Sequence, residues 1–175
     1  MSMRVTPLLT ENQIAARVAE LGAQISAEYS GKKLTVVCIL KGSFVFCADL
    51  VRRIDLDVRV DFLAVRSYGE GTESSGVVQI VSDLSKPIEG EHVLVVEDIV
   101  DTGLTITHLI ELLGTRHPAS IKICSLLNKP ARARVHVPID YLGFTIEDRF
   151  VVGYGLDDRE YKRNLPFVGV VETTA

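Results

Sequence analysis

The sequence lacks the features of several large classes of protein. Its three cysteines, Cys38, Cys47 and Cys124, are few, odd in number and placed in or beside apolar runs, so a disulfide framework is not expected. No apolar run approaches the roughly 20 residues that a membrane-spanning helix needs, and residues 1–9 contain no hydrophobic region of a signal peptide. We therefore expect a soluble, cytoplasmic protein whose cysteines lie in its core.

Positive charge is also scarce in the chain. The 19 lysines and arginines are outnumbered by 23 aspartates and glutamates, which gives a net charge of −4 and a pI near 5.6. Proteins that bind nucleic acid depend on a basic surface, so we expect no nucleic-acid partner and no membrane partner. The sequence contains neither the G-x-x-x-x-G-K-[ST] motif of a P-loop nor the G-x-G-x-x-G motif of dinucleotide-binding folds. An anionic substrate would have to be bound by a few local cations.

The composition that remains is that of one ordinary globular domain. The chain has 175 residues, of which 47% are hydrophobic and 24% charged, enough for a sizeable core. Short apolar runs predict strands buried on both faces of a parallel sheet at 34–40, 93–96 and 120–127. Helical periodicity predicts helices at 14–25, 44–54 and 106–113, the first preceded by a capping box at Thr10 and Gln13. The predicted fold class is α/β, with a mainly parallel sheet flanked by helices.

Other segments predict a hairpin and some shorter strands. Residues 58–66 and 77–81 are rich in β-formers, and we expect them to pair antiparallel across the connector 67–76. The connector, SYGEGTESSG, is polar and lacks periodicity, which fits either a mobile loop or an ordinary hairpin loop. From Ile139 onward the chain holds short β-like pieces rather than another βα unit, with a last strand predicted at 165–171.

The most informative stretch runs from Val93 to Thr105 and reads VLVVEDIVDTGLT. Glu97 and Asp98 are predicted to lie where a buried strand ends, which is the edge at which an open α/β sheet binds its ligands. The following turn starts a helix, and its glycine, threonine hydroxyls and free N–H groups suit a phosphate. Alternatively, Asp101 or Thr102 is only a helix N-cap, but this interpretation leaves the acidic pair unexplained.

Two adjacent carboxylates above a phosphate site need a further reason, because like charges repel. They make sense if the ligand also offers a vicinal diol or a divalent metal ion, and a diol together with a phosphate describes ribose 5-phosphate. The two acids, the D-T-G turn and the closing threonine resemble the 5-phosphoribosyl-1-pyrophosphate motif of the type I phosphoribosyltransferases. The resemblance extends from Leu40-Lys41-Gly42 to Arg163, and FVVGYGLD at 150–157 resembles the base-binding segment of the hypoxanthine-guanine branch.

The resemblance implies the type I phosphoribosyltransferase fold in a single domain over residues 1–175. It divides this domain into a core of about residues 10–137 and a small hood made of 1–9 and 138–175. It also makes the hairpin connector a flexible lid loop over the active site, with Ser67 and Tyr68 near its start. A lid is useful because water would otherwise attack an activated ribose.

The resemblance implies transfer of a 5-phosphoribosyl group from 5-phosphoribosyl-1-pyrophosphate to N9 of a 6-oxopurine, hypoxanthine or guanine, in purine salvage. Asp101 is the expected catalytic residue, as the base that takes the N7 proton of the purine. Lys129 has only hydrogen-bond donors, so it pairs with a 6-oxo group and leaves a 6-amino group unmatched. Mg²⁺ is the expected metal, because it binds through few carboxylates and keeps several waters.

Each part of the substrate is thereby assigned a set of residues. Ribose 5-phosphate is assigned to Glu97, Asp98, Asp101, Thr102, Gly103, Leu104 and Thr105. Pyrophosphate is assigned to Lys41, Gly42 and Arg163. The loop that contains Lys41 and Gly42 is one in which the family often has a cis peptide bond at the lysine. The purine is assigned to Lys129, Phe150, Val151 and Asp157, and the metal to Glu97, Asp98 and Asp157, directly or through water.

Some residues are expected to stay outside the chemistry. Many family members carry a lysine where this chain has Leu104, so the phosphate is expected to be bound there by backbone N–H groups and hydroxyls. Arg132 and Arg134 are interpreted as a solvated basic turn. No histidine has the spacing of a metal ligand, and none is assigned a catalytic role.

Other functions on the same scaffold remain open. A phosphoribosyltransferase directed at a pyrimidine, or an RNA-binding regulator, is disfavoured by the Lys129 and Phe150 segments and by the missing basic face. A xanthine-directed phosphoribosyltransferase stays open beside one directed at hypoxanthine or guanine. A non-catalytic nucleotide sensor would keep the phosphate turn but would not need Asp101. The expected assembly is a homodimer or a homotetramer.

Overall fold

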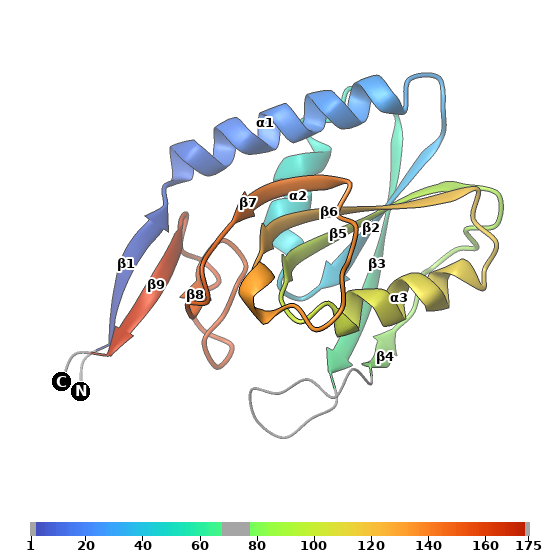
Figure 1. Ribbon diagram of the computed structural model, residues 1–175. Coiled ribbons are helices and arrows are strands. Elements are labelled where there is room, and N and C mark those ends of the chain that lie inside the picture. Colours follow the sequence, from blue (N-terminus) through green and yellow to red (C-terminus); the bar gives the residue numbers. More distant parts are fainter. Residues whose placement is uncertain (1–2, 68–77, 174–175) are drawn as a thin grey trace.

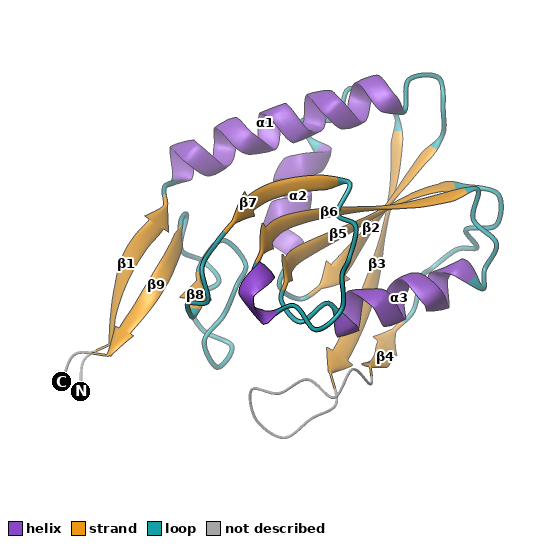
Figure 2. Ribbon diagram, viewed as in Figure 1, coloured by secondary structure: helices purple, strands orange, loops and turns teal. Residues whose placement is uncertain are grey.

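The computed structural model of the protein describes residues 3–67 and 78–173, which form two β-sheets and three α-helices (Figures 1 and 2). The strands are β1 (Met3–Leu9), β2 (Leu34–Leu40), β3 (Val58–Ser67), β4 (Val78–Ser82), β5 (His92–Val100), β6 (Ser120–Asn128), β7 (Tyr141–Thr145), β8 (Val151–Val152) and β9 (Val168–Thr173). The helices are α1 (Glu11–Glu28), α2 (Phe44–Val51) and α3 (Leu104–Gly114), and a 3-10 turn, η1, spans Pro130–Arg132.

The larger sheet has six strands in the order β4-β3-β2-β5-β6-β7. All neighbouring strands in it are parallel except β3 and β4, which pair antiparallel as the sequence predicted. From β2 the chain passes through α2 to β3, whereas from β5 it passes through α3 to β6, in the opposite direction along the sheet. The neighbours β2 and β5 therefore form a topological switch point, where open α/β sheets bind ligands.

The helices cover both faces of the larger sheet. Side chains on β5 alternate, so that Leu94 and Val96 join the core cluster under α1 and α2 while Val93 and Val95 join the cluster under α3. Figure 1 shows α1 and α2 above the sheet and α3 below it. This double coverage explains the unbroken apolar run of β5. The predicted capping box of α1 is also confirmed: Gln13 N donates to Thr10 Oγ1 (3.2 Å), and Thr10 N donates to Gln13 Oε1 (2.8 Å).

The smaller sheet joins the two ends of the described chain. Its order is β1-β9-β8, with both pairings antiparallel, and it lies at one end of the molecule (Figure 2). β7 falls within the range 138–175 expected for the hood but pairs with β6 in the larger sheet. The division between the two sheets therefore lies after Thr145. A strand this short, reached without a crossover helix, gave no sign in the sequence of its place beside β6.

Three further expectations concern cysteines, membrane crossing and the lid loop. Cys38, Cys47 and Cys124 are free and buried, as predicted. Within residues 3–67 and 78–173, no helix has both the length and the hydrophobicity that crossing a membrane requires. Ser67 is the last residue of β3, whereas Tyr68 and the connector up to residue 77 lie outside the described residues.

Candidate functional site

The acidic pair Glu97 and Asp98 lies within β5 rather than after it. The strand continues to Val100, so the prediction that it ends at the acids is wrong. The apolar run ends at Val96, but backbone pairing with β6 needs no apolar side chains and continues to Val100. Pairing with β2, in contrast, stops at Val96. Glu97 and Asp98 therefore come directly after the last residue of β5 that pairs with β2, at the opening of the crevice between these two strands.

The pKa values of both acids are raised above their ordinary values. Burial, together with repulsion from Asp98, holds the pKa of the Glu97 carboxyl well above its ordinary value. Burial also raises the pKa of Asp98, although hydrogen bonds and the charge of Arg163 oppose the shift. A divalent cation would relieve this cost, so the pair fits a metal such as Mg²⁺.

The protein supplies only part of a metal site. Among the described residues, no group of three or more histidine, cysteine, aspartate or glutamate side chains could hold a metal ion. The predicted ligand Asp157 is thus not brought together with Glu97 and Asp98. Its Oδ1 lies 3.0 Å from Arg163 Nη2, and its Oδ2 accepts a hydrogen bond from Glu160 N (2.7 Å). A metal bound at the pair would need further oxygens from substrate or water.

The turn after β5 starts α3 with a glycine. Gly103 is the N-cap, with φ 84° and ψ −13°, and has no side chain to cap the helix; Leu104 N donates to Thr102 Oγ1 at 3.4 Å. The interpretation of Asp101 or Thr102 as the N-cap is therefore wrong. A left-handed residue in this position favours glycine. The first N–H groups of an α-helix have no intrahelical acceptor, so they remain available to an anion.

The residues predicted to bind ribose 5-phosphate share one cavity. It has a volume of about 300 Å³ and is lined by the ends of β2 and β5 and by the start of α3. Six of the assigned residues, and Gly42 from the pyrophosphate set, contribute to its wall: Glu97, Asp98, Asp101, Thr102, Gly103 and Thr105. Leu104 is not among them, in keeping with a side chain that carries no charge for the phosphate.

The turn after β2 packs directly onto the acidic pair. The Leu40–Lys41 peptide bond is cis, as the resemblance implied. A methyl group on Gly42 would overlap the Asp98 carboxylate, so only glycine lets this turn come so close. Lys41 Nζ lies 2.8 Å from Glu160 Oε2, a carboxylate of the C-terminal segment.

The C-terminal segment reaches the same turn from the other side. A side chain on Gly155 would overlap the carbonyl oxygen of Gly42, so the two backbones touch. Arg163 Nη1 donates to the Gly155 carbonyl (2.8 Å), and its charge opposes the rise that burial causes in the pKa of Asp98. Lys41, Gly42 and Arg163, the predicted pyrophosphate set, are thus brought together beside the acidic pair.

The residues assigned to the purine differ in exposure. Lys129 is 7% exposed, and its ammonium has no hydrogen-bond or ion-pair partner among the described residues. Phe150 is 55% exposed, whereas Val151 is buried in β8 opposite Val170. The Lys129 ammonium is therefore available to a ligand that supplies an acceptor, and the exposed ring of Phe150 offers a face for stacking.

Arg132 is the functional candidate that the sequence did not reveal. Its Nε donates to Asp101 Oδ1 at 2.7 Å, so the interpretation of Arg132 as a solvated residue is wrong. The contact joins residues 31 positions apart, and no local sequence pattern predicts it. Only its position, three residues after the strand-end Lys129, pointed toward the site.

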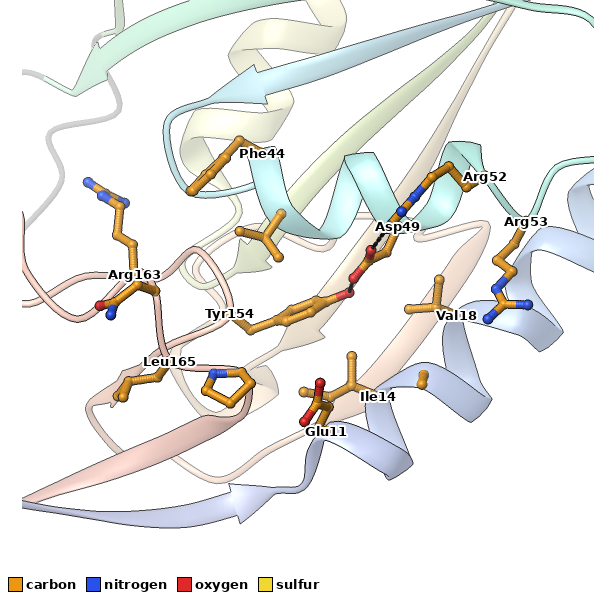
Figure 3. A pocket seen from close by; sticks show the side chains of 14 residues that line it. Glu11, Ile14, Val18, Phe44, Asp49, Arg52, Arg53, Tyr154, Arg163 and Leu165 are labelled. Atoms are coloured by element: carbon orange, nitrogen blue, oxygen red, sulfur yellow. Dashed lines mark hydrogen bonds and ion pairs between the residues drawn. The ribbon is translucent and has the colours of Figure 1, made fainter.

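A second, larger groove lies behind the Lys41 turn (Figure 3). It has a volume of about 630 Å³ and lies between α1, α2 and residues 163–166. Tyr154 crosses it, and its hydroxyl donates to Asp49 Oδ2 (2.5 Å), which ties the C-terminal segment to α2. The groove contains neither the acidic pair nor the start of α3, so we do not assign the reaction to it.

Comparison with known proteins identifies relatives along nearly the whole chain. Residues 5–159 match the model of the phosphoribosyl transferase domain family. The chain is 49% identical to a hypoxanthine phosphoribosyltransferase of Haemophilus influenzae, with 95% of each chain covered. It is 48% identical to a hypoxanthine-guanine phosphoribosyltransferase of Mycobacterium avium, covering 94% of this chain and 84% of the relative. A crystal structure of a hypoxanthine phosphoribosyltransferase from Staphylococcus aureus superposes with a TM-score of 0.92 at 48% identity, covering 95% of this chain and 91% of the other.

Proposed function

The chain belongs to the phosphoribosyltransferase family and has its type I fold, and from this premise we propose how its residues carry out the reaction. The enzyme transfers the 5-phosphoribosyl group of 5-phosphoribosyl-1-pyrophosphate to a 6-oxopurine, hypoxanthine or guanine, in purine salvage. The single cavity lined by the acidic pair, the Gly103 turn and Gly42 is the observation that supports our assignment of residues. In this proposal the whole chain acts as one domain, with the smaller sheet as its hood.

The sugar phosphate lies across the tip of β5. Its 5-phosphate accepts hydrogen bonds from the N–H groups at the start of α3 and from the hydroxyls of Thr102 and Thr105, with Leu104 contributing only its backbone. The two ribose hydroxyls donate to Glu97 and Asp98. Gly103 at the N-cap supports this arrangement, because it has no side chain of its own over the helix start, and the Thr102 hydroxyl already lies there, 3.4 Å from Leu104 N.

Pyrophosphate lies on the cationic side of the acidic pair. Lys41, the Gly42 backbone and Arg163 bind its oxygens, and Lys41 must first release Glu160. Mg²⁺, held by Glu97 and Asp98, neutralises charge on the departing pyrophosphate when it is bound. Asp157 contacts the ion only through water, because both of its oxygens already accept contacts from Arg163 and from the backbone of Glu160.

The purine is recognised by its 6-oxo group and by its ring face. The ammonium of Lys129 donates to O6, Phe150 stacks on the ring, and the Val151 backbone and Asp157 lie at its edge. A 6-amino group would leave the Lys129 donors unpaired, which selects against adenine. Asp101 takes the N7 proton as N9 attacks C1 of the ribose. The loop that begins at Ser67 and Tyr68 excludes water during this step.

The enzyme acts as a homodimer or a homotetramer in this proposal. Large apolar side chains remain exposed on the outer strands of the larger sheet, with Val60 and Phe62 on β3 and Val81 on β4. An apolar area of this kind is typical of surfaces that bind another protein. The observation favours association of subunits.

The substitution Asp101→Asn tests the assignment of the general base. It keeps the size of the side chain but removes the proton acceptor, so we expect turnover to fall by about 10² to 10⁴-fold. Binding of 5-phosphoribosyl-1-pyrophosphate, measured by calorimetry, should change little. Initial rates with hypoxanthine, guanine, xanthine and adenine would rank the bases. Unchanged turnover in the variant would remove Asp101 from the mechanism, and no turnover by the unmodified protein would favour a nucleotide sensor.

A further inference from the structure

We propose that Arg132 is a positioning residue that holds Asp101 in the orientation needed to accept the N7 proton. This inference rests on the proposed role of Asp101 as the general base. Arg132 Nε donates to Asp101 Oδ1 at 2.7 Å, and the two side chains are 33% and 38% exposed. Asp101 Oδ2 accepts no hydrogen bond from another described residue. One oxygen is thus held by the guanidinium, and the other remains free for the substrate.

The backbone around Arg132 fixes its distance from Asp101. Lys129 N donates to the Val100 carbonyl (2.9 Å), on the N-terminal side of both partners. On the C-terminal side, the N–H groups of Arg134 and Val135 both donate to the Thr102 carbonyl (2.9 and 3.2 Å). Residues 129–135 therefore run alongside residues 100–102 and are bonded to them at both ends.

This setting makes the contact different from an ordinary surface ion pair. Exposed pairs contribute little, largely because two flexible side chains must be ordered to meet. Here each partner rises from backbone that is already held in register with the other, so less ordering remains to be done. A guanidinium keeps its charge at every working pH and donates along fixed directions, which orients the carboxylate as well as attracting it.

The same contact sets the distance between Asp101 and Lys129, the two groups that bind one edge of the purine. N7 and O6 are neighbours on that edge, so the site must offer an acceptor beside a donor. Asp101 is the acceptor and Lys129 is the donor, and they lie on the two segments that Arg132 joins. We therefore assign to Arg132 the alignment of base and ammonium toward a 6-oxopurine whose N7 carries a proton.

The proton transfer that this geometry serves is balanced without a further reactant. The N7–H bond breaks as an Oδ2–H bond forms on Asp101, and the electron pair remains on the purine. N9 then forms its bond to C1 of the ribose while the bond between C1 and the pyrophosphate oxygen breaks. Arg132 takes no proton, and its contact with Oδ1 leaves Oδ2 as the only carboxylate oxygen available to N7.

A double-mutant cycle tests this proposal. Arg132→Ala should lower kcat about tenfold, the order expected for loss of one charge-assisted hydrogen bond, and should leave the KM for 5-phosphoribosyl-1-pyrophosphate nearly unchanged. In the Asp101→Asn background, the same substitution should have almost no further effect, because the group that it positions is gone. Arg132→Lys keeps the charge and should recover part of the rate, and it also guards against a loss of folding in the alanine variant.

Asp148→Ala is the matched control for a purely structural role. Asp148 Oδ1 lies 3.9 Å from Arg132 Nη1 and is the other carboxylate that faces this guanidinium. If Arg132 only stabilised its loop, Asp148→Ala would reproduce much of the loss, and Arg132→Ala would cost the same factor with and without Asp101. Either result would overturn the proposal, as would an unchanged kcat for Arg132→Ala. If Asp101→Asn alone leaves turnover unchanged, the base assignment falls first and the role of Arg132 falls with it.

Discussion

Two strand-to-helix turns meet at the site and depend on glycine for different reasons. We call residues 40–43, between β2 and α2, the lysine turn and residues 101–103, between β5 and α3, the acidic turn. In the acidic turn, Gly103 has φ 84°, and a methyl group there would lie 2.6 Å from the Val135 carbonyl oxygen. In the lysine turn, Gly42 has no positive φ, but a methyl group would overlap the Asp98 carboxylate.

The two turns therefore need glycine for different purposes, one for the conformation of the backbone and the other for the space that the site requires. The acidic turn needs glycine for its own conformation and for the approach of residues 134–135, which bond to the Thr102 carbonyl. The lysine turn needs glycine because a functional side chain occupies the space beside it. Substitution should therefore affect stability most at the acidic turn and activity most at the lysine turn.

Gly42→Ala is the substitution with the largest expected effect on activity. The added methyl group must displace the Asp98 carboxylate, and a displacement of about 1 Å in an active site can cost about 10²-fold in rate. Gly103→Ala should instead lower the free energy of unfolding by more than about 1 kcal/mol, because a residue with a side chain is strained at this φ and meets the Val135 carbonyl. Steady-state kinetics and urea unfolding of both variants measure the two effects.

Gly114→Ala is the control for both substitutions. A methyl group there meets no atom within 4 Å, and the residue ends α3, so kinetics and stability should stay close to those of the unmodified enzyme. The comparison between the two turns would fail if Gly42→Ala and Gly103→Ala lost activity and stability in the same proportion.

The two turns also differ in how far the sequence predicted them. The acidic turn was predicted in part: the local sequence indicated a strand followed by a turn and a helix start, but it placed the end of the strand at the acids, whereas β5 continues to Val100. Lys41 and Gly42 were identified by their resemblance to a family loop, but the reason for the glycine is its contact with Asp98, which only the folded chain creates.

The features that sequence reasoning missed all arise from contacts between distant segments. β5 extends to Val100 because β6 pairs with it there, although the apolar run has already ended. β7 joins the larger sheet through backbone pairing with β6, which no side-chain pattern encodes. Arg132 reaches Asp101 because two loops are hydrogen-bonded side by side. Periodicity and turn chemistry describe single segments, so they predict elements well and these contacts poorly.

Glu97→Gln should raise the stability of the protein while it lowers its activity. The variant tests whether the buried acidic pair, in contrast to the cations beside it, costs the protein stability. Because burial raises the pKa of folded Glu97 above its ordinary 4.5, the unfolded chain releases a proton that the folded protein keeps. The contribution of Glu97 to stability is therefore fully present below pH 4.5 and is lost as pH rises through the folded pKa. The melting temperature of the metal-free variant should exceed that of the unmodified protein above neutral pH, and the gap should close toward pH 4.5.

Glu89→Gln is the control for the loss of a carboxylate, since Glu89 is exposed in a turn away from the site. Its melting temperature should follow that of the unmodified protein at each pH. If both variants gained the same stability, burial of the Glu97 carboxylate would not be the cause of the gain. A Glu97→Gln variant with full activity would separate the pair from the binding of the substrate and its metal.

Glu160→Gln tests the lysine turn with the smallest expected effect. Glu160 Oε2 lies 2.8 Å from Lys41 Nζ, with side chains 64% and 68% exposed, so substrate must displace a weak ion pair before the ammonium can bind pyrophosphate. Removal of this competitor should tighten binding of 5-phosphoribosyl-1-pyrophosphate by less than about fivefold, and the gain should disappear at high salt. Calorimetric titrations of Lys41→Met, with and without Glu160→Gln, provide the control: Glu160→Gln should have little effect once the ammonium is absent. Because Glu160 Oε1 also lies 3.5 Å from Arg163 Nη2, a gain that persists without Lys41 would mean that Glu160 competes for Arg163 or repels the substrate directly.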